Sequence, residues 1–316
     1  MIGIDLGGSN LRAARIDESA MTGHREPVGE PRDPPRIVEK VARVVESLAQ
    51  GEGGPVGVGI AAMLSDRRGT VANSPHLRWR DVPFGELLAA RLGPRYQLGV
   101  YNDVNAIIWG EAQQGAARGC TSVLGVYVGT GIGGGVIANG QLVTGTSNCA
   151  GEIGHTKVRW DRDAAPCQCG QRGCIEAYVG GSYLLARIER ETGSSARGDQ
   201  IVTPDEVDRA AAAGDPWALG LWRELAPLLA VTLGNAVAVL NPERLVLGGG
   251  VLARCPLLVR LVTEHMAETT NGPSWGPLSV VLAELGDDAG LVGAAHLAAS
   301  GTDLITRPIP SSGPEP

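Results

Sequence analysis

Short apolar runs alternate with longer amphipathic stretches along the chain, which is typical of an α/β protein. The runs at residues 1–5 and 11–16 predict two strands joined by a glycine-rich hairpin turn. Apolar residues then recur at helical spacing from Ile37 to Leu48. The polar residues 24–35, before this helix, predict a loop. After the helix, the pattern predicts strands at 56–60, near 70–72 and at 97–101. It also predicts helices at 84–92 and from Asp103 to about residue 114.

The second half of the chain repeats the beginning. Residues 121–128 predict an apolar strand, residues 129–135 a second glycine-rich turn, and residues 136–137 the start of a return strand. This repetition predicts two similar halves that face one another. The remaining pattern predicts helices at 176–192, 204–213, 216–240, 256–268 and 290–299 and strands at 244–247 and 280–282, with Pro227 expected to kink or split the longest helix.

Composition narrows the class of protein. The 316 residues, 43% of them hydrophobic, are enough for two domains with substantial cores. A net charge of −7 argues against nucleic acid as the main partner, because phosphate contacts need a basic face. The apolar run at 225–240 is shorter than the ~20 residues that a membrane span needs, and no charged and apolar leader precedes the first strand. We therefore expect a cytoplasmic protein that binds neither membrane nor nucleic acid.

One histidine and three cysteines lie within a short span, at His155, Cys167, Cys169 and Cys174. These residue types form a complete ligand set for tetrahedral Zn²⁺, and four protein ligands leave no open position for a catalytic water. Buried thiols and disulfides are the alternatives, but two of the cysteines are too close in sequence to pair comfortably. The pattern favours a structural zinc that fixes two glutamates just outside the cage, Glu152 and Glu176. Carboxylates held in this way suit a site that reads the hydroxyl groups of a small polar ligand.

Glycine-rich segments follow three predicted strands, at residues 7–8, 129–135 and 248–250. Backbone N–H groups with no side chain in the way can cradle phosphate oxygens. Neither hairpin matches the GxxxxGK[ST] loop or the dinucleotide fingerprint, and one hairpin alone would indicate only a tight turn. Together the three loops indicate a nucleotide clamped between the halves, with its phosphates on the two hairpins and its adenosine near the third loop.

Asp103 follows a predicted strand and begins a predicted helix, which is where ligands collect in open α/β sheets. The simpler interpretation of a single aspartate at this position is a helix N-cap. The two roles are compatible, and a carboxylate that accepts the proton of an attacking hydroxyl is what phosphoryl transfer requires of its base.

The segments DLGGSN, Asn102-Asp103, GTGIGGG, GEIGH, CxCGxxGCxE and LGGGV occur in this order over residues 5–251. With them the sequence resembles the ROK family, and more narrowly its zinc-containing bacterial glucokinases. The resemblance implies an actin-like, ribonuclease-H-like ATPase fold, in which two similar α/β domains flank a nucleotide and sugar cleft. It also implies phosphoryl transfer from Mg-ATP to the 6-hydroxyl of a hexose, with glucose as the first expectation.

The resemblance assigns roles to individual residues, and it makes Asp103 the base that deprotonates the sugar. The residues that would contact the sugar are Asn102, Asp103, Gly133, Glu152, His155 and Glu176. Those that would bind ATP and its Mg²⁺ are Asp5, near the metal and the γ-phosphate, Gly7, Gly8, Ser9 and Asn10 in the first phosphate loop, Thr130 and Gly131 in the second, and Gly249 and Gly250 beside adenosine. The zinc ligands would be His155, Cys167, Cys169 and Cys174, with the second ring nitrogen of His155 turned to the sugar.

Several positions depart from the usual ROK pattern. Many relatives carry Lys where this chain has Asn10, so we expect a phosphate charge to be neutralised differently here, with Arg12 as the candidate. Residues 61–63 replace a common Pro-Gly turn, and His76 stands within Pro-His-Leu where Pro-Asn-Leu is frequent. His76 has no assigned role, and a plain loop histidine is the simpler interpretation. These changes concern sugar preference rather than the reaction.

The resemblance also implies a two-domain organisation, a homodimer or else a tetramer, and a set of rivals. The expected domains are residues 1–104, with the helix at about 290–300 packing back on them, and residues 105–300 with the zinc loop, followed by a poorly ordered tail at 301–316. A kinase for N-acetylmannosamine, N-acetylglucosamine, fructose or allose is the main rival. A polyphosphate-dependent kinase, a sugar-responsive ROK regulator and a non-enzymatic sugar-binding module are weaker ones, since no basic groove or DNA-binding segment is apparent.

Overall fold

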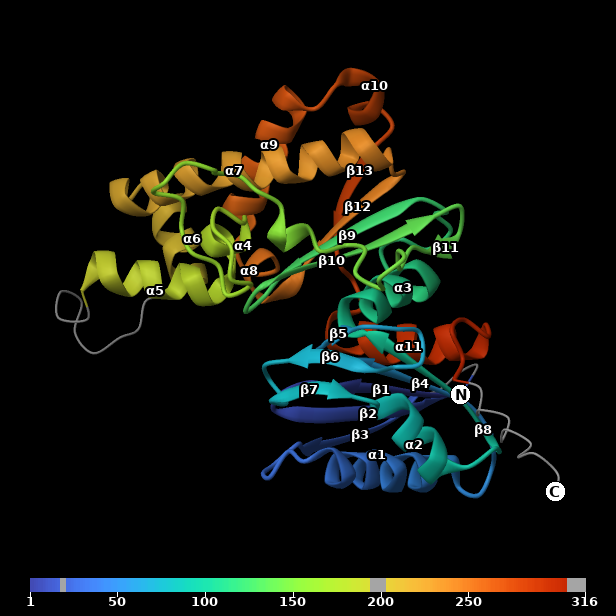
Figure 1. Ribbon diagram of the computed structural model, residues 1–316. Helices are drawn as coiled ribbons and strands as arrows, with labels where there is room; N and C mark the ends of the chain where they lie inside the picture. The colour runs from blue at the N-terminus through green and yellow to red at the C-terminus, as the bar shows by residue number, and fades with distance from the viewer. Residues whose placement is uncertain (18–20, 194–202, 306–316) are drawn as a thin grey trace, which may run out of the picture. The chain divides into compact units, whose positions relative to one another are not determined.

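The computed structural model describes residues 1–17, 21–193 and 203–305, and it divides the chain into two compact units (Figure 1). Unit 1 consists of Met1–Arg118, Thr144–Ala150 and Leu285–Pro316. Unit 2 consists of Gly119–Val143 and Gly151–Glu284. Most of the expected tail, residues 306–316, lies outside the described residues.

Unit 1 is built on a mixed sheet with the strand order β3-β2-β1-β4-β8. A β1–β2–β3 meander pairs antiparallel, and β4 and β8 extend the sheet parallel to β1. The parallel strands are almost continuously apolar, as expected where helices cover both faces. The strands are β1 (Ile2–Leu6), β2 (Asn10–Ile16), β3 (Met21–Pro27), β4 (Gly54–Ile60) and β8 (Tyr96–Asn102), and a smaller antiparallel sheet contains β5 (Met63–Leu64), β6 (Val71–Ser74) and β7 (Trp79–Val82).

Helices cover both faces of this sheet (Figure 1). The helices are α1 (Pro34–Ala49) and α2 (Phe84–Leu92) on one face and α3 (Asp103–Gln114) and α11 (Ala289–Ala299) on the other, after η2 (Gly286–Asp288). Neighbouring residues of β2 point to opposite faces, so that Ala13 belongs to the core under α1 while Ala14 packs with Leu291 and Ala295 of α11. The last helix of the chain therefore packs on the sheet that the first strands form.

Unit 2 repeats this topology with the strand order β11-β10-β9-β12-β13. Again an antiparallel meander comes first and two parallel strands follow. The strands are β9 (Val123–Val128), β10 (Ile132–Ala138), β11 (Gln141–Leu142), β12 (Arg244–Gly248) and β13 (Ser279–Leu282). The helices are η1 (Ile153–His155), α4 (Glu176–Val179), α5 (Gly181–Thr192), α6 (Pro204–Ala212), α7 (Pro216–Leu240), α8 (Gly249–Leu252), α9 (Pro256–Thr269) and α10 (Gly272–Trp275). Two units with one shared strand order define the actin-like ATPase fold that the sequence predicted.

Several local predictions were wrong. The loop predicted at 24–35 overlaps edge strand β3, which extends to Pro27 and whose exposed side chains hid it from the hydrophobic pattern. The helix expected at 176–192 is divided at Gly180 into α4 and α5. Of the kink or split expected at Pro227, the split does not occur, because α7 continues through this residue as one helix of 25 residues. The second glycine-rich turn is also shorter than expected, because β10 begins at Ile132 and contains Gly133–Gly135.

Helix α7 has the bounds that the sequence predicted, Pro216–Leu240. Among the described residues, it is the one helix whose length and hydropathy would allow it to cross a membrane. Its Trp222, Leu225 and Leu229 are buried in the main core of unit 2, and the helix packs against α6 and α9. These contacts are those of a core helix.

Candidate functional site

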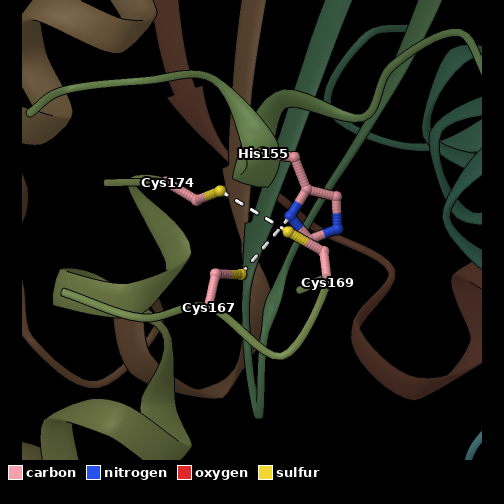
Figure 2. Close-up of side chains that lie close together, drawn as sticks. All are labelled: His155, Cys167, Cys169 and Cys174. Atoms are coloured by element: carbon pink, nitrogen blue, oxygen red, sulfur yellow. Dashed lines mark hydrogen bonds between the residues drawn. The ribbon is translucent and has the colours of Figure 1, made fainter. Parts of the chain in front are cut away.

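The four predicted zinc ligands converge in unit 2 (Figure 2). Their ligand atoms all lie within 4.8 Å of one another. The Sγ atoms of Cys169 and Cys174 are 3.7 Å apart, and the Sγ of Cys167 is 3.7 Å from Nδ1 of His155. Ligands at the usual bond lengths on a tetrahedral zinc are separated by about 3.8 Å. All six cysteines are free thiols, so the disulfide alternative fails and the cage fits Zn²⁺.

The histidine of this cage is positioned by close backbone packing. His155 ends the short helix η1, which lies against strand β10. A Cβ on Gly134 would lie 2.6 Å from the carbonyl oxygen of Gly151, and one on Gly154 would lie 2.3 Å from that of Ile132. No side chain fits at either contact, so glycines of GTGIGGG and GEIGH serve the packing of η1 on β10.

The two predicted glutamates border the zinc cage. The Oε2 of Glu152 is 3.8 Å from Nε2 of His155, the ring nitrogen that faces away from the thiols. Burial raises the pKa of Glu152, although the charge of His155 opposes the shift. Glu176 lies with Oε1 3.8 Å from the Sγ of Cys167, and its Oε2 accepts a hydrogen bond from the backbone N–H of Ile132 at 2.8 Å. Glu176 thus joins the zinc cage to the start of β10.

The second and third glycine loops lie together in unit 2. Thr130 and Gly131 follow β9, where the N–H groups of Gly181 and Ser182 bond the carbonyls of residues 129 and 130 at 2.8 and 2.9 Å. Gly249 and Gly250 follow the neighbouring strand β12. Gly249 has φ +84°, and a Cβ there would lie 2.5 Å from the carbonyl oxygen of Val128. The loops therefore meet at the carboxyl ends of adjacent parallel strands, where ligands bind in such sheets.

Unit 1 brings the predicted carboxylates Asp5 and Asp103 near one another. Asp5 is the residue before the last of β1 and lies opposite Gly59 of β4, and Asp103 follows the next strand, β8. A Cβ on Gly59 would lie 3.8 Å from the Cα of Asp103. Glycine thus leaves space on the strand that separates the two carboxylates. The first hairpin turn is closed beside them by a bond of 3.1 Å from Gly7 N–H to the carbonyl of Asn10.

The N-cap of α3 is Asn102 rather than Asp103. The Oδ1 of Asn102 accepts the N–H of Asn105 at 3.1 Å, and its Nδ2 donates to the carbonyl of Ala62 at 3.3 Å. Asp103 is the first helical residue, and its Oδ1 accepts the adjacent N–H of Val104 at 3.0 Å. Its carboxylate also lies at the positive end of the helix dipole.

Arg12 is already ion-paired within unit 1. It binds Asp5 through two guanidinium nitrogens, and its Nη1 is 2.9 Å from Oδ2 of Asp287. Burial raises the pKa of Asp5, and the charge of Arg12 only partly offsets this. Two carboxylates therefore already neutralise the guanidinium that we had expected to replace the missing lysine at Asn10.

Two residues beside these sites carried no clear signal in the sequence. His76 packs on the first hairpin, because a Cβ on Gly8 would lie 2.7 Å from its Cβ. Lys157 lies beside the zinc cage and donates to one of its thiols. Both contacts join segments distant along the chain. The one hint in the sequence was that His76 stands in Pro-His-Leu where Pro-Asn-Leu is frequent.

The chain belongs to the ROK family, whose match covers residues 1–300. A glucokinase of Streptomyces coelicolor is 33% identical over 94% of this chain and 96% of that protein. An N-acetyl-D-glucosamine kinase of Yersinia pseudotuberculosis is 30% identical over 93% of this chain and 97% of that protein. The crystal structure of a ROK family glucokinase from Streptomyces griseus in complex with glucose and AMPPNP is 31% identical, covers 95% of this chain and 99% of its own, and has a TM-score of 0.77.

Proposed function

We propose that this protein is an ATP-dependent hexokinase that transfers a phosphoryl group to the 6-hydroxyl of glucose. The relatives at 30–33% identity are sugar kinases over nearly their whole length, which supports the class of enzyme. A related protein binds glucose and AMPPNP, which supports a hexose and ATP as the ligands. The observation that carries the proposal for this chain is the pair of carboxylates, Asp5 and Asp103, at the ends of β1 and β8.

Asp103 is the proposed general base. It is the first residue of α3 and follows strand β8, which lies next to the strand that pairs with β1 and its Asp5. A carboxylate that accepts the proton of an attacking hydroxyl is what phosphoryl transfer requires of its base. A positioned base of this kind typically contributes a factor of about 10²–10⁴ to the rate.

Residues of unit 2 are proposed to read the other sugar hydroxyls. Glu152 and Glu176 offer carboxylate oxygens, and His155 keeps Nε2 free of the thiols. Asn102 and the backbone at Gly133 complete the proposed sugar contacts. Zn²⁺ on the four cage ligands would supply no chemistry to the sugar and would fix the loop that holds these groups. The effect of zinc on the loop and the effect of the direct sugar contacts can therefore be measured separately.

The glycine loops are proposed to hold ATP. Residues 7–10 and 130–131 are proposed to offer backbone N–H groups to the phosphates, and residues 249–250 to contact adenosine. Asp5 would ligate Mg²⁺, which would neutralise phosphate charge, and a carboxylate is the ligand type that this cation uses. Arg12 then acts by orienting Asp5, because it binds that carboxylate through two nitrogens.

N-Acetylglucosamine is the alternative substrate with direct support, since a kinase for that sugar is among the relatives at 30% identity. The other hexoses, a polyphosphate donor and a regulatory role rest on no observation in this chain. Dimerisation, a cytoplasmic location and binding to neither nucleic acid nor membrane stay predictions.

The test is a panel of hexoses with Mg-ATP, followed by coupled detection of ADP. We expect kcat/KM for glucose to exceed that for N-acetylglucosamine, N-acetylmannosamine, fructose and allose. Preference for an N-acetylated sugar would reassign the substrate and leave the kinase in place. Glucose binding with no ADP formed from any sugar would overturn the proposal.

A further inference from the structure

Lysine is rare in this protein, and one of its two lysines contacts the zinc cage. Lys40 and Lys157 are the lysines among 27 basic residues. The Nζ of Lys157 donates a hydrogen bond to the Sγ of Cys174 at 3.0 Å. Cys174 is fully buried, whereas the lysine lies at the surface and reaches over the cage.

The backbone holds Lys157 directly opposite Cys174. The two residues form an isolated antiparallel bridge. The flanking bonds run from Val158 N–H to the carbonyl of Gly173 and from Ile175 N–H to the carbonyl of Thr156, both at 2.9 Å. Lys157 and Cys174 are therefore a pair without mutual backbone bonds, the type in which facing side chains approach most closely. The register of the two segments therefore places the side chains of Lys157 and Cys174 opposite one another.

The charge of the cage explains why a cation belongs at this position. Three thiolates and one Zn²⁺ leave a net charge of −1, since a ligating histidine is neutral. Glu152 and Glu176 lie next to the cage and add negative charge. Among the described residues, Lys157 is the one cationic side chain with a hydrogen bond to a cage sulfur. An ammonium is a compact point charge that can balance the excess.

We propose that Lys157 is a positioning residue that stabilises the zinc–thiolate cage by a charge-assisted hydrogen bond to Cys174. This inference rests on the zinc part of the proposed function and does not depend on the sugar. Groups that support metal ligands from outside typically change metal affinity by about 10- to 100-fold when they are removed.

The experiment measures zinc affinity by competition with a chromogenic chelator, in the full-length protein loaded with zinc. We expect Lys157→Met to bind zinc about 10- to 100-fold more weakly than the parent, whereas Lys157→Arg keeps affinity within a few-fold. Lys40→Met is the matched control, because its Nζ donates only to the carbonyls of Pro27 and Val28 in unit 1. The control should leave zinc affinity unchanged.

Each outcome decides one question. A parent protein that binds no zinc would overturn the zinc site itself. Equal affinities in the parent and in Lys157→Met would overturn the role of Lys157 while the site stands. Weakening in Lys157→Arg as large as in Lys157→Met would show that the charge is not the cause. If Lys157→Met does not fold, Lys157→Gln is measured in its place, with the same expectation.

Discussion

Asn102 and Asp103 are adjacent in the sequence, and the structure gives them separate tasks. Asn102 caps α3 through its Oδ1 and binds the carbonyl of Ala62, two residues after β4, through its Nδ2. Asp103 contributes its charge at the first turn. The sequence offered Asp103 as a helix N-cap, and the structure gives that role to the preceding residue, Asn102. The role of Asp103 as a base stays a prediction.

His296 of α11 makes stability depend on pH in a definite direction. Burial lowers its pKa, and the positive amino terminus lowers it further. As pH falls below about 6.5, the unfolded chain binds a proton at this histidine that the folded protein does not. Stability is therefore lost toward acid, in the window between the lowered folded pKa and the unfolded value.

The variant His296→Gln isolates this effect, because Gln retains a polar partner for Gln114, which is 3.1 Å from the imidazole. We expect the free energy of unfolding in urea to fall less steeply in the variant than in the parent, from about pH 7 to about pH 5. Parallel pH profiles for the two proteins would contradict the assignment.

The contact of η1 with β10 is the element on which the unit 2 site depends. A methyl group on Gly134 would lie 2.6 Å from a carbonyl oxygen of residue 151 and 2.9 Å from a side-chain carbon of Ile153. We expect Gly134→Ala to cost about 1–3 kcal/mol of stability by overpacking, and to weaken zinc and sugar affinity together because His155 is displaced. Gly23→Ala is the control, because no atom lies within 4 Å of the added carbon. This variant should leave stability, zinc affinity and sugar affinity unchanged. Calorimetric melting and sugar titration check this.

Removal of zinc should weaken sugar binding, because the same segment holds the proposed sugar-binding groups. In Cys169→Ser, or after chelation, the cage loses a ligand and the loop that holds Glu152 and Glu176 loses its support. We expect the Kd for glucose to rise while unit 1 keeps its fold. Binding of glucose with unchanged Kd in protein shown to be free of metal would disprove the link.

Elements with a one-sided apolar pattern could be predicted from the sequence, and elements held by backbone pairing alone could not. The spacing from Ile37 to Leu48 predicted α1 because those side chains form its buried face. Strand β3 has no buried side chain, so only its ladder with β2 reveals it. The convergence of His155 and the three cysteines could be predicted because zinc coordination restricts its ligands to a few residue types. Lys157 could not, since its role depends on a register between two loops.

The first glycine hairpin has the same topological position in both units, directly after the first strand of the sheet. The next candidate group lies in different places: in unit 2 it is Gly249, after the adjacent parallel strand β12, and in unit 1 it is Asp103, one strand further along, after β8. Asp5 and Tyr127 occupy equivalent places, one residue before the last of β1 and β9. Only unit 1 has a carboxylate there, which suits it to the metal and the transferred phosphate. The repeated fold thus provides two ligand platforms with different chemistry.

The central claim is that Asp103 takes the proton of the sugar hydroxyl, and a single pair of variants tests it most directly. Asp103→Asn keeps the size of the side chain and removes its charge, and Glu86→Gln is the matched control in the first turn of α2. Steady-state turnover with glucose and Mg-ATP is measured beside calorimetric binding of glucose. We predict that Asp103→Asn loses about 10²–10⁴-fold in kcat with little change in glucose Kd, while the control keeps both. Turnover of Asp103→Asn within a few-fold of the parent would contradict the account.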